Sequence, residues 1–118
     1  GGRIRILVPD MNKVLRSYSN NQMDMYNSGQ PEMFKSSSPS SKLAYILFGN
    51  LYNADPNYPK DDHYLGHKMA YNSESLNELL DTVGFMRVMD DSSRFKDILE
   101  FEKQHLPMWY MLTIEAEK

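Results

Sequence analysis

The sequence predicts an α/β fold built on a small mixed sheet of three strands with about three helices. Residues 3–8 alternate as in a strand, whereas the apolar residues of 11–18, 42–52 and 76–83 recur at helical spacing. Two further β-rich runs, 85–89 and 109–117, lie near the end of the chain after these helices. Strands that follow one another in this way favour an antiparallel C-terminal pair attached to an α/β unit.

The first strand and the first helix follow one another directly. Ile4, Ile6 and Val8 share one face of the strand, and the two arginines at positions 3 and 5 share the other with Leu7. Pro9 is expected to end the strand, and Asp10 is placed to cap the helix that follows. The apolar stripe of this helix at i, i+3, i+4 and i+7 consists of Met11, Val14, Leu15 and Tyr18.

The most distinct local pattern lies at residues 71–85. Asn72 is a suitable N-cap, and Gly84 is placed to take the left-handed conformation that closes a helix. The predicted buried stripe consists of Leu76, Leu79, Leu80 and Val83. A strand over 85–89 should follow at once, residues 94–106 are compatible with a short helix, and 109–117 form the final strand.

Two segments are expected to be loops. Residues 27–41 contain Gly29, Pro31 and the serine-rich tract 36–41, which is interrupted by Pro39. Residues 53–66 are punctuated by two further prolines and end on Gly66. We therefore expect the helix between them to cover 42–52, and the loops to be where specificity would reside.

Composition limits the classes of function. The chain has 118 residues, which fits a single domain over 1–118, and a formal net charge of −3, which gives no general attraction to nucleic acid or anionic lipid. Cysteine is absent, so thiolate metal sites and cysteine nucleophiles are excluded. No apolar run approaches the roughly 20 residues of a membrane span. These features predict a cytoplasmic location with no nucleic-acid or membrane partner.

Three segments, taken in order, resemble one family. Residues 1–10, GGRIRILVPD, are similar to the "PGG-R-hydrophobic" fifth strand of class I S-adenosylmethionine-dependent methyltransferases of the type 11-like group. Residues 67–85 resemble the stretch "H-x-x-x-[FY]-[DN]-x-x-x-L-x-x-L-L-x-x-x-G-F" that leads into the sixth strand. Residues 112–118, LTIEAEK, look like the "hydrophobic-E-A-x-K" seventh strand. The resemblance covers most of the chain apart from the loops.

The resemblance implies the C-terminal portion of a Rossmann-like methyltransferase domain. In the family, S-adenosylmethionine is held mainly by the first half, through a glycine-rich turn that has no counterpart among the glycines of this sequence. We therefore expect these residues to form the substrate-side half, to bind no cofactor alone and to be inactive in isolation. The alternative is a non-catalytic protein-interaction module.

Candidate site residues come partly from position and partly from the resemblance. Asp10 directly follows a strand, where functional groups of open α/β sheets lie, although capping the helix is sufficient to explain it. The resemblance places His67 and Tyr71 on the acceptor-substrate side, with Asn50 nearby. The alternative for Tyr71 is packing beneath the helix start. His63 and His67 are weak candidates for a metal site, because Gly66 between them disfavours the helix that such spacing needs.

The resemblance also implies a strand order with the C-terminal strand between the other two. The first strand would then carry an edge without a partner, which is an association hazard. We expect a homodimer, formed edge to edge or through the helix at 10–21, or alternatively a complementary N-terminal half.

Overall fold

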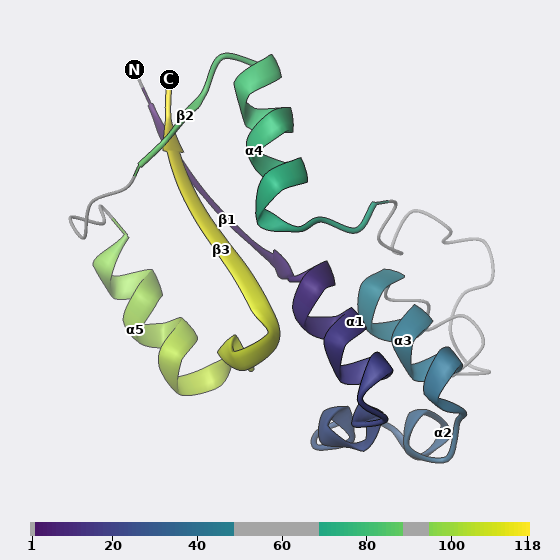
Figure 1. Cartoon of the computed structure of the whole chain (residues 1–118). Helices are drawn as coiled ribbons and strands as arrows, with labels where there is room; N and C mark the ends of the chain where they lie inside the picture. Colours follow the sequence, from purple (N-terminus) through teal and green to yellow (C-terminus); the bar gives the residue numbers. More distant parts are fainter. Residues whose placement is uncertain (1, 49–68, 89–94) are drawn as a thin grey trace, which may run out of the picture. The chain divides into compact units, whose positions relative to one another are not determined.

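The computed structural model describes residues 2–48, 69–88 and 95–118, which fold into two compact units (Figure 1). The first unit combines Gly1–Asp10 with Tyr71–Lys118, and the second is Met11–Ala70. The elements of the first unit are β1 (Arg3–Pro9), α4 (Ser73–Thr82), β2 (Met86–Arg87), α5 (Lys96–His105), the 3₁₀ turn η3 (Met108–Tyr110) and β3 (Met111–Glu117). The elements of the second unit are α1 (Met11–Ser19), the 3₁₀ turn η1 (Met23–Tyr26), α2 (Glu32–Lys35) and α3 (Pro39–Phe48).

The sheet of the first unit has the order β1-β3-β2. β3 pairs antiparallel with β1 over seven residue pairs, from Arg3 opposite Glu117 to Pro9 opposite Met111, and antiparallel with β2 at Met86 and Arg87. The predicted central position of the C-terminal strand is confirmed. The prediction of a mixed sheet is wrong in one respect, because both neighbouring pairs are antiparallel and only the two outer strands run in the same direction.

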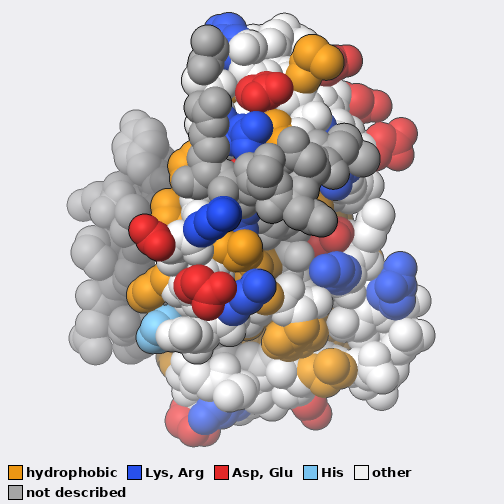
Figure 2. Space-filling model, turned by 90° about the vertical axis from the view of Figure 1, so that its left-hand side faces the viewer, with side chains coloured by type: hydrophobic (Ala, Val, Ile, Leu, Met, Phe, Trp, Pro, Cys, Tyr) orange, Lys and Arg blue, Asp and Glu red, His pale blue; other side chains and the backbone are white. Residues whose placement is uncertain are grey.

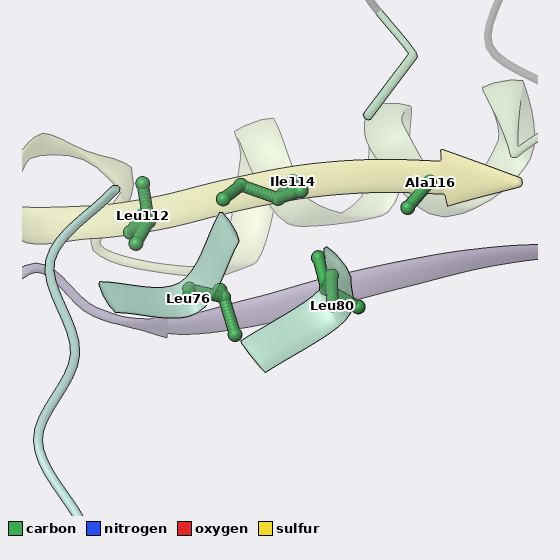
Figure 3. Close-up of a cluster of buried hydrophobic side chains, with 5 residues drawn as sticks. All are labelled: Leu76, Leu80, Leu112, Ile114 and Ala116. Carbon is green, nitrogen blue, oxygen red and sulfur yellow. The ribbon is translucent and has the colours of Figure 1, made fainter. Parts of the chain in front are cut away.

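One face of this sheet is apolar and is covered by α4. Leu76 and Leu80 of the helix lie against Leu112, Ile114 and Ala116 of β3 (Figure 3). Burial of each leucine side chain contributes about 1.5–3 kcal/mol to stability. Two other members of the predicted helix stripe, Leu79 and Val83, are exposed, so the buried part of the stripe is narrower than expected.

The residues that were predicted to begin and end α4 are confirmed. The Asn72 side chain accepts a hydrogen bond from the Ser75 backbone N–H, and the Ser75 hydroxyl accepts one from the Asn72 N–H. This reciprocal pair is a capping box with serine in place of the usual acidic residue. Gly84 follows the helix at φ +86°, which is the left-handed conformation expected there.

The second unit corrects two predictions. Residues 27–41 are not one loop, because they contain α2 and the start of α3, and the described part of the chain holds five α-helices rather than about three. Ser38 initiates α3: its hydroxyl accepts a hydrogen bond from the Ser41 N–H, and Pro39 occupies the first helical position. The predicted helix over 42–52 therefore begins earlier, and its residues after Phe48 lie outside the described part, as does the predicted loop 53–66.

Among its described residues, the core of the second unit includes a charged side chain, Lys42. Its buried apolar members are Val14, Met23, Tyr26, Phe34, Ile46 and Leu47. Lys42 is buried among them, and its Nζ donates to Asp24 Oδ1 at 2.7 Å and lies 5.7 Å from the centroid of the Phe34 ring. The hydrogen bond and the positive charge of Lys42 lower the pKa of Asp24 below its ordinary value. Leu15 and Tyr18 of the predicted α1 stripe are exposed.

Candidate functional site

The carboxyl end of β1 brings together two of the four predicted site residues. Asp10 lies directly after the strand, its N–H donates to the Tyr110 carbonyl at 2.8 Å, and its backbone forms an isolated parallel bridge with Tyr71. β1 and β2 run in the same direction, so this is also the carboxyl side of the outer strands. Ligands of open α/β sheets bind at such an edge.

Tyr71 has a structural role as well as a position at this edge. It immediately precedes the N-cap Asn72, and it packs against the core cluster that contains Leu76, the fourth residue of α4. An apolar residue before the N-cap that packs near the fourth helical residue is a hydrophobic staple, which fixes the direction in which the chain enters the helix. This packing is the structural alternative expected for Tyr71, and it accounts for its partial burial. The backbone bridge to Asp10 is a second role that the sequence did not predict.

The other two predicted substrate-side residues, Asn50 and His67, lie outside the described residues, as does His63, the second weak candidate for a metal site. Within residues 2–48, 69–88 and 95–118 there is no group of three or more His, Cys, Asp or Glu side chains that could hold a metal ion. In the same ranges, no helix has the length and apolar character needed to cross a membrane.

A depression of about 370 Å³ lies between α4 and β2, and neither Asp10 nor Tyr71 lines it. It is lined by Glu74, Asn77, Glu78, Leu80, Asp81, Phe85 and Arg87. Three carboxylates and one guanidinium favour cationic over anionic solutes. Arg87 also donates to the Ser73 hydroxyl at 3.2 Å, which ties β2 to the start of α4.

The sequence carries a signal for this depression. Glu74, Glu78 and Asp81 recur at i, i+4 and i+7, which places three acidic side chains on one side of a helix. A solvated helix face has the same pattern, so spacing alone does not separate the two interpretations.

The second polar arrangement that sequence reasoning missed lies on the face of the sheet opposite α4. Arg5 Nη1 contacts Glu115 Oε2 at 3.2 Å, and Arg5 Nη2 contacts Glu102 Oε2 of α5 at 2.6 Å. Arg5 and Glu115 are directly opposite in the β1–β3 register, as are Arg3 and Glu117, whose side chains pair at 3.4 Å. The alternation of charged residues in both strands was the available signal; nothing in the sequence indicated Glu102.

The backbone of β1 has one side that faces away from β3. The Lys118 N–H donates to the Gly2 carbonyl, and the Asp10 N–H donates to the Tyr110 carbonyl, so the even-numbered residues bond to β3. The backbone groups of Arg5 and Leu7 therefore point to the other side, where no strand among the described residues pairs with β1.

Comparison with known proteins assigns neither a family nor a function to this chain. No protein-family model matches the chain, and neither curated proteins nor solved structures gave a match.

Proposed function

We propose that these 118 residues form the substrate-side half of a class I methyltransferase-like domain, which needs a cofactor-binding half to act on a substrate. The observation that carries the proposal is the strand order β1-β3-β2, in which the C-terminal strand lies antiparallel between two strands of common direction. The sequence resemblance implies this arrangement, and chain order alone would not favour it, because β3 is not a neighbour of β1 in sequence.

The edge of β1 supports the same proposal. A strand with outward-facing backbone groups at Arg5 and Leu7 can accept one more strand. The cofactor-binding half would supply that strand, together with the glycine-rich turn that is not among these 118 residues. S-adenosylmethionine would then bind to the added half, and Asp10 and Tyr71, at the carboxyl end of β1, would border the methyl acceptor.

The test is a fusion of the first four strands and their helices from a class I methyltransferase of known structure to Gly2 of this chain. We expect the fusion to bind S-adenosylmethionine, measured by calorimetry, because β1 completes the sheet of the added half. The matched control is the same fusion with Leu7→Pro. This substitution removes an N–H that points away from β3 and leaves the hydrogen bonds between β1 and β3 in place. The control should no longer bind S-adenosylmethionine. A fusion that folds, with exchange-protected amides in β1 and β3, but binds no cofactor would contradict the proposal.

The second candidate function is a protein-interaction module. It is favoured by large apolar side chains exposed on the first unit, among them Met86, Phe101 and Trp109. The two functions differ in the fusion experiment, because an interaction module has no reason to complete a cofactor-binding sheet.

A further inference from the structure

Helix α5 lies on the sheet with a charged side chain buried and with large apolar side chains exposed to solvent. Glu102 is its buried residue, whereas Ile98 and Phe101 are 49% and 56% exposed. Figure 2 shows the side of the molecule that carries α5, where hydrophobic side chains are exposed among charged ones. A helix that packs on a sheet normally buries an apolar stripe, so α5 is docked in a different way from α4.

The docking contact is an ion pair. Arg5 Nε and Nη2 donate to the two carboxylate oxygens of Glu102 at 3.4 and 2.6 Å, a two-pronged contact between planar groups. The side chains of Arg5 and Glu102 are 8% and 6% exposed. Both groups lose water when α5 docks, and this loss offsets much of their attraction. The apolar contribution of α5 is limited, because Ile98 and Phe101 are exposed and Leu99 is buried only in part.

The sheet keeps a satisfied arginine when α5 is absent. Arg5 also pairs with Glu115, its direct neighbour across the β1–β3 register, at 3.2 Å. The apolar face of the sheet is covered separately by Leu76 and Leu80 of α4. Loss of α5 therefore leaves neither an unpaired arginine on the sheet nor an opening in the apolar core.

We infer that α5 is a releasable strap over the polar face of the sheet, held by the Arg5–Glu102 pair and able to detach while β1, β3 and α4 stay folded. A helix of ten residues is marginal in water, so the detached strap unfolds and its amides become open to exchange. Release uncovers Arg5 and Glu115 together.

Native-state hydrogen exchange, measured by NMR on the whole chain, tests the strap. In the unmodified protein we expect α5 amides to exchange at least about tenfold faster than those of β3 and of the centre of α4, because opening α5 requires no global unfolding. Exchange of α5 at the same free energy as β3 would overturn the inference.

Two variants make the test specific to the ion pair. Glu102→Gln should accelerate exchange in α5 by about tenfold or more and leave β3 unchanged, whereas Glu100→Gln, on an exposed residue of the same helix, should change neither. Replacement of the three charges with apolar residues, as Arg5→Met, Glu102→Leu and Glu115→Val, should slow exchange in α5. The inference fails if Glu102→Gln leaves α5 unchanged or accelerates α5 and β3 equally.

Discussion

At the scale of single residues, one feature of this protein is a buried lysine side chain. Lys42 is buried in the second unit, but its amine reaches an exposed carboxylate on Asp24 and lies over the Phe34 ring. A long aliphatic stem allows lysine to cross an apolar layer in this way. The sequence predicted helix at Lys42 but not its burial, because burial depends on η1 and α2, which lie partly within a segment predicted to be a loop.

The Asp24–Lys42 pair predicts a titration behaviour. Lys42→Met should raise the pKa of Asp24 towards its ordinary value of 3.8, because the hydrogen bond and the positive charge that lower it are removed. In the unmodified protein the pair stabilises the fold above pH 3.8, and this stabilisation is lost as the pH falls through the lowered pKa of Asp24. Carboxyl chemical shifts followed by NMR measure the pKa. Lys35→Met, at an exposed pair with Glu32, is the matched control and should leave Asp24 unchanged.

Replacement of Gly84 should lower the stability of the protein through the backbone conformation alone. A Cβ added there would meet only Lys118 Cε at 3.9 Å, so the cost of Gly84→Ala comes from φ +86° and not from a clash. We expect a loss of about 1 kcal/mol in the free energy of unfolding, measured with urea. Gly2→Ala, at an open position without positive φ, serves as the comparison. Equal effects of the two substitutions would show that the conformation of Gly84 is not the cause.

At the scale of elements, capping residues separate the successful predictions from the failures. Asn72 caps the start of α4 and Gly84 follows its end, as the sequence predicted, because helix caps are formed by residues that are close together in sequence. Ser38 and Pro39 carry the same kind of signal for α3, but the surrounding serines made the tract resemble a loop. The buried side of a helix is set by distant partners, so the exposure of Leu79 on α4 and of Leu15 on α1 was beyond sequence reasoning.

Removal of the α4 cap should cost stability. Asn72→Ala removes the acceptor of the Ser75 N–H and should lower the free energy of unfolding by about 0.5–2 kcal/mol, measured by urea denaturation. Glu78→Ala, on an exposed residue of the same helix, should stay within about 0.5 kcal/mol of the unmodified protein. A loss for Asn72→Ala no larger than that for Glu78→Ala would contradict the capping role.

At the scale of the whole molecule, sheet order and site assembly were predictable to different degrees. The central position of β3 followed from the resemblance. Hydrophobic alternation placed the apolar face of β1 on Ile4, Ile6 and Val8; Ile6 and Val8 pack against the core, whereas Ile4 is exposed. The division of the chain into two units had no local signature, because it depends on contacts among η1, α2 and α3. Of the predicted site, Asp10 and Tyr71 meet at the end of β1, while Asn50 and His67 stay predictions.

The edge of β1 predicts self-association in the absence of a complementary half. Sedimentation velocity over a range of concentrations should show a dimer, because the outward backbone groups of Arg5 and Leu7 can pair with a second copy. Leu7→Pro should shift the equilibrium to monomer while the β1–β3 pairing is retained. A monomer at every concentration, or a dimer insensitive to Leu7→Pro, would exclude pairing through this edge.

The central claim is that these residues form the half of a methyltransferase-like domain that does not hold the cofactor. Calorimetric titration of the 118-residue chain with S-adenosylmethionine tests it most directly. The account predicts no binding heat, because the glycine-rich turn is absent from the sequence. Binding in the micromolar range would contradict the account, and would mean that residues interpreted here as structural form a cofactor site.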